Sequence, residues 1–426
     1  MNLILIIALF VLFLSGMPIC FSLGIISTIG VILLGFPIEV IAQKTFSGID
    51  TYSLIAVPLF ILSGDLMSKG GVSKRMVEFS RSLIGHVHGS LAMVAVVACM
   101  FFSAVTGAAL AASVAIGGIL IGPMVEEGYD RGFIASLIAS AGSIGPIIPP
   151  SITLLIYGVL TNTSIASLFI GGLVPGILMG LSLMVYCYIV SKRRNYRGKN
   201  TNKVSLKEIV ITGKSAILAL LMPVIIIGGI LGGVFTPTEA AGIAVAYAFL
   251  LGKFVYRELK WSELPNILKK SAITTGVLFF IVSNARVFMW YLTVNQIPQQ
   301  LADIMLQSID NKYVLLAVIN IVLLFAGTFI DTISNVVIFV PLFLPLVEYF
   351  GIDLIHFGVI VALNLTIGMC TPPLGISIFA TASIAKISVS DMFKDLFPQI
   401  AVLIGILILV TYVPDTVLII VNTFVK

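Results

Sequence analysis

A membrane-length apolar segment between Phe133 and Leu160 is interrupted near its middle by glycine and prolines, in the sequence SIGPIIPPS at residues 143–151. Each proline removes a backbone donor and clashes with the turn before it, so an α-helix cannot run through this stretch. Hydrocarbon offers no water to the backbone groups that the interruption releases, and irregular backbone at this depth is tolerated only where it lines a cavity. The sequence therefore predicts a broken membrane helix that lines a binding site.

The rest of the chain is equally apolar. Of its 426 residues, 59% are hydrophobic and 10% are charged, with a mean hydropathy of +1.16. The apolar runs are continuous, which is typical of transmembrane helices, whereas a β-barrel would show alternation. We predict an all-α polytopic membrane protein without a separate soluble domain. The net charge of +5 lies mostly in loops, so it indicates topology and not nucleic-acid binding.

Basic residues gather at 69–81, 192–214, 253–270 and 386–394, which the positive-inside rule assigns to the cytoplasm. Counting spans between these clusters leaves one apolar segment too many in each half of the chain. The count is restored if both halves contain a re-entrant helical hairpin, the first entering from inside and the second from outside. Both termini are then expected in the periplasm, with the first apolar stretch retained as a helix because it lacks the basic region of a signal peptide.

The interrupted segment has a second copy, TIGMCTPP at residues 366–373. Six identities lie 223 residues apart without a gap: Gly128 and Gly351, Asp130 and Asp353, Ile144 and Ile367, Gly145 and Gly368, Pro149 and Pro372, Pro150 and Pro373. The span count gives the two copies opposite orientations. Inverted repeats with discontinuous helices are the architecture of secondary transporters, in which the helix breaks bind substrate and coupling ions.

We expect five parts along the chain. Residues 1–90 form scaffold helices and an interfacial arm helix; 91–190 form the first repeat core, with hairpin 91–126, broken helix 131–160 and helix 166–190; 191–212 form a cytoplasmic basic loop; 213–310 form further scaffold helices and an arm; 311–426 form the second repeat core, with hairpin 312–349, broken helix 353–384 and final helix 397–423.

Two charged residues fall inside predicted membrane segments. A buried carboxylate is costly when unpaired, so Asp331 is interpreted as a cation-site or gating residue, or as the cap of the second hairpin arm. Asn335, one turn later, could share either role. Arg286 could contact a substrate carboxylate, form a structural ion pair, or extend to the lipid headgroups.

An intramembrane enzyme is the rival class. A serine protease would need a histidine at membrane depth, whereas His86, His88 and His356 all map to interfaces, the last on the solvent side. An aspartyl type would need a second deep carboxylate beside Asp331. We therefore expect a transporter and not an enzyme. An ion channel and a stand-alone Na⁺/dicarboxylate symporter remain as alternatives.

Six motifs distributed over essentially the whole chain resemble the large membrane subunit of tripartite ATP-independent periplasmic (TRAP) transporters. They are SLIAVPLFILSGDLM (53–67), GGVSKRMV (70–77), ASAGSIGPIIPPSI (139–152), FTPTEAAG (235–242), FIDTISN (329–335) and FGVIVALNLTIGMCTPPLG (357–375). The resemblance implies an elevator-type carrier of the ion-transporter superfamily fold, located in the bacterial inner membrane. It also implies Na⁺-coupled import of an organic anion, of C4-dicarboxylate or sialic acid type. Its partners would be membrane lipid, a small membrane subunit (Q) and a periplasmic substrate-binding protein (P).

The resemblance further implies two or more coupling Na⁺ ions, bound where each hairpin tip meets a helix break. The first site would use Ser103, Thr106, Gly107, Ser143 and Gly145. The second would use Gly327, Thr328, Asp331, Gly368 and Thr371. Substrate contacts would come from Pro149, Pro150, Asn335, Pro372, Pro373 and Arg286. The first tip is less polar than the Ser-Gly-Ser type found in many family members, and backbone carbonyls would supply many of the ligands.

Overall fold

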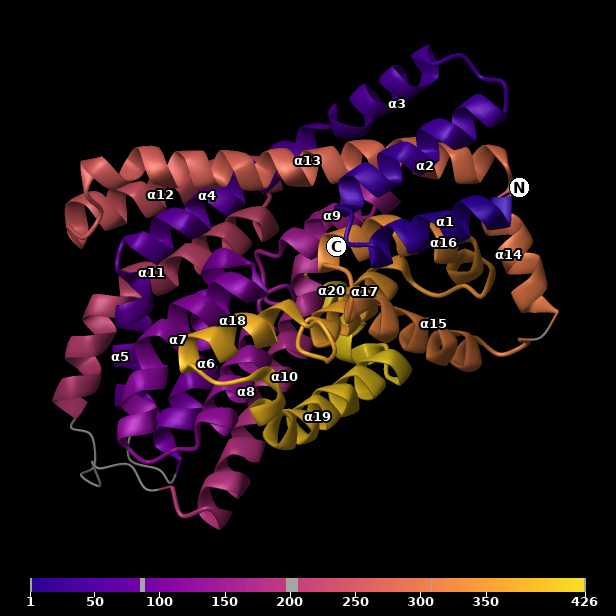
Figure 1. Ribbon diagram of the computed structural model, residues 1–426. Coiled ribbons are helices and arrows are strands. Elements are labelled where there is room, and N and C mark those ends of the chain that lie inside the picture. The colour runs from indigo at the N-terminus through magenta and orange to yellow at the C-terminus, as the bar shows by residue number, and fades with distance from the viewer. Residues whose placement is uncertain (1, 85–88, 197–205, 308, 425–426) are drawn as a thin grey trace.

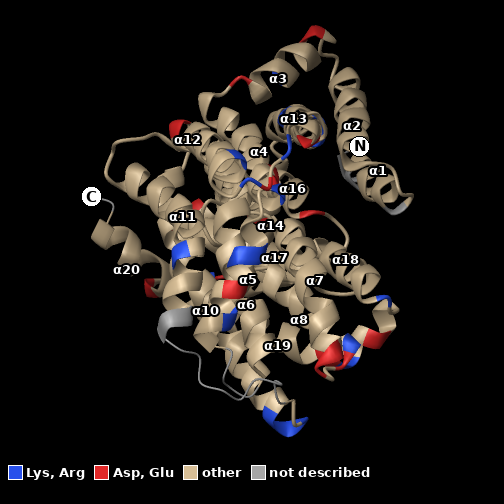
Figure 2. Ribbon diagram, turned by 90° about the vertical axis from the view of Figure 1, so that its left-hand side faces the viewer, with Lys and Arg blue, Asp and Glu red and all other residues tan. Residues whose placement is uncertain are grey.

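The computed structural model describes residues 2–84, 89–196, 206–307 and 309–424, and within these ranges it contains helices and no strands (Figure 1). His86, His88 and much of the predicted basic loop lie outside the described residues. Eight of the described helices are long and apolar enough to cross a membrane. Most of the ribbon in Figure 2 carries no charge, and much of the charge lies at helix ends and turns. The chain is an all-helical, multi-pass membrane protein, as predicted.

Ten α-helices lie in the described residues from 2 to 196. The first group is α1 (Asn2–Leu14), α2 (Ile19–Leu33), α3 (Glu39–Ile49), the 3-10 helix η1 (Tyr52–Ile55), α4 (Ala56–Lys69) and α5 (Val72–Ile84). The second group is α6 (Ser90–Thr106), α7 (Ala109–Glu126), α8 (Arg131–Gly142), α9 (Ile152–Thr161) and α10 (Ile165–Arg193). Helices α6 and α7 form a hairpin, and α8 and α9 are the two parts of one interrupted helix.

The second half begins with α11 (Leu206–Leu231), α12 (Pro237–Leu250), the π-helix η2 (Leu251–Val255), the 3-10 helix η3 (Trp261–Glu263), α13 (Leu264–Val294) and α14 (Ile297–Leu306). It continues with α15 (Lys312–Gly327), α16 (Thr332–Tyr349), α17 (Leu354–Gly368), α18 (Ile376–Ala385), η4 (Val389–Met392), α19 (Phe393–Tyr412) and α20 (Asp415–Phe424). Helices α15 and α16 form the second hairpin, and α17 and α18 the second interrupted helix. The long helix α13 crosses the top of Figure 1 beside α2 and α3 and packs against both.

Short polar side chains fix where the interrupted helices begin. The Asp130 carboxylate accepts the Phe133 N–H at 3.1 Å, and the Asp353 carboxylate accepts the Ile355 and His356 N–H groups at 2.8 and 3.0 Å. These N-terminal caps satisfy backbone donors that have no partner inside the helix. A capping box starts α12, in which Thr236 and Glu239 exchange both bonds.

Contacts between the two halves come in matched pairs. Helix α6 packs on α8 as α15 packs on α17, α7 packs on α18 as α16 packs on α9, and α19 packs on α8 as α10 packs on α17. The Tyr157 hydroxyl, near the end of α9, donates to the Leu354 carbonyl at the start of α17 (2.7 Å). Arg131, at the start of α8, donates to the Ala385 carbonyl at the end of α18 (3.1 Å). The two interrupted helices therefore run in opposite directions through the core.

Two sequence-based expectations need correction. The final helix predicted over 397–423 is two helices, α19 and α20, because Pro414 has no N–H to continue the ladder and Val413 leaves the helical conformation. His356, expected on the solvent side, is 3% exposed, and its Nε2 lies 2.8 Å from the Val410 carbonyl oxygen. Helix α19 packs across this part of α17 and removes it from solvent.

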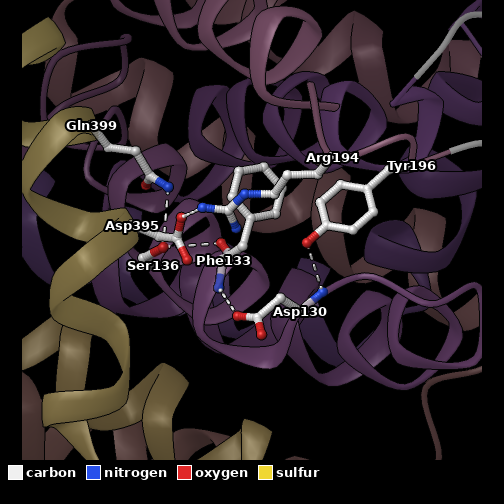
Figure 3. A network of polar contacts seen from close by, with 7 residues as sticks. All are labelled: Asp130, Phe133, Ser136, Arg194, Tyr196, Asp395 and Gln399. Carbon is white, nitrogen blue, oxygen red and sulfur yellow. Dashed lines mark hydrogen bonds and ion pairs between the residues drawn. The ribbon is translucent and has the colours of Figure 1, made fainter. Parts of the chain in front are cut away.

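A polar network fastens the first turns of α8 to α10 and α19 (Figure 3). Arg194, which caps the end of α10, forms an ion pair with Asp395 in the first turn of α19, and its guanidinium lies over the Phe133 ring at 5.6 Å. The Gln399 amide donates to the Ser136 hydroxyl at 3.0 Å. The side chain of Asp395 is 5% exposed and that of Arg194 is 31% exposed, so only the cation can reach water by itself.

This asymmetry predicts unequal costs for removing either partner. Arg194→Ala leaves a buried carboxylate unpaired and is expected to destabilise the protein by about 3 kcal/mol. Asp395→Asn leaves a cation that can turn to solvent, and about 1 kcal/mol is expected. Thermal midpoints in one detergent would measure both, with Lys312→Ala as the control, because Lys312 is exposed and forms no ion pair with the described residues. Equal midpoints for the two variants would contradict this account.

Candidate functional site

The tip of the first hairpin lies directly against the first helix break. Gly107, at the tip, has a left-handed backbone (φ +63°), and a Cβ there would lie 2.1 Å from the Pro150 carbonyl oxygen. A Cβ on Gly145, in the break, would lie 2.9 Å from the Ala108 carbonyl carbon. Only glycine permits this approach at either position. The tip and the break therefore form one unit made of backbone against backbone.

The residues on both sides of this first contact carry oxygen atoms without hydrogen-bond donors. The carbonyls of Gly145, Ile148, Pro149 and Pro150 accept no hydrogen bond from the described part of the chain. The Ser103 hydroxyl is fully buried and meets no partner there either. The hydroxyls of Thr106 and Ser143 donate to carbonyls of their own helices, Phe102 and Ser140, which leaves their lone pairs available. Clusters of carbonyl and hydroxyl oxygens are what small hard cations coordinate.

The second half repeats the contact between glycines. A Cβ on Gly368, at the end of α17, would lie 2.6 Å from the Cα of Gly327 at the tip of the second hairpin. The first residue of α16 also reaches the break, since the Thr332 hydroxyl lies 2.8 Å from the Met369 sulfur. The carbonyls of Gly327, Thr371 and Pro372 accept no hydrogen bond from the described residues. The hydroxyls of Thr328 and Thr371 donate to carbonyls of Phe325 and Ile367, both at 2.8 Å.

Asp331 begins α16 as its N-terminal cap. Its carboxylate accepts the N–H groups of Ile333 and Ser334, each at 3.0 Å, and the Ser334 hydroxyl. The capping role considered for this residue is therefore present in the structure, and its role at a cation site stays a prediction. Asn335 is fully buried: its Nδ2 donates to the carbonyls of Ile330 and Asp331, and its Oδ1 meets no partner among the described residues.

The two breaks are neighbours in the core. The Cys370 thiol, in the second break, lies beside the hydroxyls of Ser140, near the end of α8, and Ser143, at the start of the first break. The Pro149–Pro150 and Pro372–Pro373 peptide bonds are both cis. The first pair is buried, whereas Pro372 is half-buried and Pro373 is exposed. The structure thus gathers the predicted ion-site residues at two adjacent tip-to-break contacts.

Arg286 lies apart from this centre. It lines two cavities, and no described lining residue of either belongs to a break or a hairpin tip. The structure does not bring Arg286 together with the other predicted substrate residues.

Sequence reasoning missed a buried polar chain behind the second break. The Asn364 amide donates to the carbonyl and side-chain oxygens of Asn320 at 2.9 and 2.8 Å, and Asn320 donates to the Thr411 hydroxyl at 2.9 Å. Both asparagines stand inside apolar runs, where an unpaired amide is costly. That pattern is the signal that could have identified them from the sequence.

Comparison with known proteins decides the family. A family model described as "Tripartite ATP-independent periplasmic transporter, DctM component" matches residues 6–416. The chain belongs to this family. The resemblance to the TRAP large membrane subunit that its motifs indicated is confirmed.

Relatives of this DctM-family chain include permeases named for several acids. It is 40% identical over 394 residues to the C4-dicarboxylate TRAP transporter large permease protein DctM of Pseudomonas aeruginosa, covering 92% of each chain. It is 40% identical over 411 residues to the sialic acid TRAP transporter large permease protein SiaM of Vibrio cholerae, covering 96% of each. It is 39% identical to the isethionate TRAP transporter permease protein DctMQ of Oleidesulfovibrio alaskensis, covering 95% of this chain and 64% of that protein.

Two solved structures share the fold at low sequence identity. The YdaH transporter of Alcanivorax borkumensis is 13% identical with a TM-score of 0.56, covering 84% of this chain and 86% of that one. The Neisseria gonorrhoeae MtrF structure is 14% identical with the same TM-score, covering 87% and 83%. These likenesses support a transporter fold and carry no information on substrate.

Proposed function

We propose that this DctM-family chain is the large permease subunit of a Na⁺-coupled TRAP transporter in a bacterial inner membrane. In this proposal it imports an organic anion that a periplasmic binding protein delivers. The names of the relatives support an acidic substrate, since C4-dicarboxylates, sialic acid and isethionate share only an anionic group. The DctMQ relative is longer than this chain, which supports a small membrane subunit as the further partner.

The observation that carries the proposal is the pair of glycine contacts between hairpin tips and helix breaks. In both halves a glycine of the tip meets the backbone of the break, at Gly107 with Pro150 and at Gly327 with Gly368. A Na⁺ ion bound by the surrounding carbonyls would hold each tip in place. Helices α9 and α18 begin at the breaks, and the partial positive charge of their first turns would attract an anion between them.

The same contacts are compatible with elevator movement. Each tip and its break belong to the core formed by α6–α10 and α15–α20, so the glycine contacts between tip and break involve no residue of α1–α5 or α11–α14, although Thr106 of the first tip also packs on Gly64 of α4. The core could therefore carry ions and solute past those helices without dismantling either site. Substrate would lie near the proline pairs and Asn335, within reach of both ion sites.

Reconstitution tests the proposal. The chain is placed in proteoliposomes with its small membrane subunit, and uptake of radiolabelled succinate, N-acetylneuraminate and isethionate is followed with and without the binding protein. We expect saturable uptake of one of these acids that requires both the binding protein and an inward Na⁺ gradient, with K⁺ as the control cation. Uptake without the binding protein would favour a stand-alone symporter, and flux that does not saturate would favour a channel.

A further inference from the structure

Arg286 is a charged residue inside the membrane-spanning helix α13 that has no counter-charge in the described part of the chain. Its side chain is half-buried, forms no ion pair there, and its Nε is buried without a hydrogen-bond partner. Leaving the buried part of a guanidinium without a hydrogen-bond acceptor is costly. A group outside this chain would therefore gain much by binding it.

A cavity of about 430 Å³ opens beside this guanidinium. We call it the outer basin; besides Arg286 its polar lining comes from Thr51, Ser53, Asn162, Thr163 and Ser164. The Thr51 hydroxyl is buried and, like the Arg286 Nε, has no partner among the described residues. None of the described residues that line the outer basin is acidic. A second cavity of about 350 Å³ is lined by Arg286, Lys44 and four other described residues, none of them acidic.

Packing, and not an opposite charge, holds Arg286 in place. Helix α3 lies so close that a Cβ on Gly48 would be 2.6 Å from the Arg286 Cγ. The Ser283 hydroxyl, almost one turn earlier on α13, donates to the Thr45 carbonyl of α3 at 3.2 Å. Glu239, in the first turn of α12, does not line the outer basin, and its carboxylate accepts the Thr236 N–H and hydroxyl at 2.8 and 2.9 Å.

The outer basin is separate from the breaks but close to them. It also contains Gly158 of α9, seven residues beyond the Ser151 cap, which corresponds to about 10 Å along the helix. Helices α10 and α12 begin at its wall, with Ser164 as the cap of α10 and Pro237 as the first residue of α12. The positive ends of two long helices therefore face the same space as the guanidinium. The span count assigns these helix ends to the periplasmic side.

We propose that the outer basin is a second anion-binding site, in which Arg286 holds the carboxylate or sulfonate of the transported acid before that acid reaches the helix breaks. Guanidinium binds such groups through two parallel hydrogen bonds, and the hydroxyls of Thr51 and Ser53 can donate to the same oxygens. The identity of the ligand as the transported acid rests on the proposed function. The preference of the basin for anions rests on its lining alone.

Charged thiol reagents test this preference without transport. Ser53→Cys places an isosteric thiol in the basin, and the four native cysteines are buried. The protein, with its small subunit in phosphatidylcholine nanodiscs, is treated with the anionic reagent MTSES or the cationic reagent MTSET. We expect MTSES to react faster, and Arg286→Gln to lower the ratio of the two rates about tenfold. Lys312→Gln, which removes an exposed charge outside the basin, is the control and should leave the ratio unchanged.

Protection identifies the occupant. Succinate, N-acetylneuraminate or isethionate should slow MTSES labelling of Ser53→Cys, and the acid that protects should be the one that is taken up. Arg286→Gln should raise the KM for its uptake about tenfold with little change in maximal rate, as expected for loss of a binding contact.

Three results would overturn the proposal: an unchanged rate ratio in Arg286→Gln, no labelling at either Ser53→Cys or the second reporter Thr163→Cys, or protection by added phosphatidylglycerol and by none of the acids. The last result would identify a lipid headgroup site. An absence of Na⁺-driven uptake would contradict the proposed function. The ratio of the MTSES and MTSET rates would still test whether the outer basin prefers anions.

Discussion

Asp331→Asn is expected to reduce Na⁺-driven uptake by about 100-fold or more, equivalent to about 2.7 kcal/mol, while leaving the protein folded. Asparagine is as good a helix cap as aspartate, so the N–H groups of Ile333 and Ser334 keep an acceptor. The substitution removes the negative charge at the second hairpin tip. It also replaces the oxygen that accepts the Ser334 hydroxyl by an NH2 group, to which that hydroxyl can act as acceptor instead. If that charge offsets a bound Na⁺, coupling is lost although the start of α16 is intact.

The matched control is Asp353→Asn. Asp353 caps α17 in the same way, through the N–H groups of Ile355 and His356, but it lies at the far end of that helix from the break. This variant should transport as the wild type does, and both variants should share its thermal midpoint. Wild-type uptake by Asp331→Asn would show that the carboxylate serves only as a cap. Asp331→Ala should lose uptake and also about 1 kcal/mol of stability, because the cap is removed as well.

Gly368→Val is expected to abolish uptake by separating the second hairpin tip from the break. Its Cβ would lie 2.6 Å from the Gly327 Cα, which is backbone and cannot rotate away. Overpacking of this kind costs about 1–3 kcal/mol, and the tip can relieve it by moving. Gly145→Val should act in the same way at the first site, where the Ala108 carbonyl carbon would be 2.9 Å away. Uptake measures the loss of transport in each variant, and the thermal midpoint measures the cost of overpacking.

Gly118→Val is the control for both glycine variants. Gly118 lies in α7 of the first hairpin, and a Cβ there would meet nothing within 4 Å. Uptake should persist in this variant, because the valine side chain would extend from the surface of α7 without contacting other backbone. Wild-type uptake by Gly368→Val and Gly145→Val would contradict the assignment of both contacts to ion sites.

The elements of the core could be predicted because their boundaries are set by local signals. The hairpins and breaks begin and end close to where the sequence placed them, since Asp130 and Asp353 cap the interrupted helices and the proline pairs stop them. Pro414 is an equally local signal, but the long apolar run around it favoured one continuous final helix, and the structure has two.

Packing contacts between helices that are far apart in the chain could not be predicted from one sequence. The burial of His356 depends on α19 packing over α17, and the cavity beside Arg286 depends on α3, α9, α10 and α12 meeting around α13. Periodicity describes which face of a helix is apolar, but it does not say which remote helix covers that face. The grouping of tips with breaks was expected from the family resemblance, whereas the atomic contacts between glycines came only with the structure.

Binding of ²²Na⁺ to the purified complex, without substrate, tests the central claim most directly. The claim is that the two contacts between hairpin tips and helix breaks are cation sites inside the membrane. The account predicts saturable binding of two or more ions per chain, with fewer ions bound by Gly368→Val and by Asp331→Asn and no loss in Gly118→Val. An absence of saturable Na⁺ binding, or equal binding by all four proteins, would contradict it.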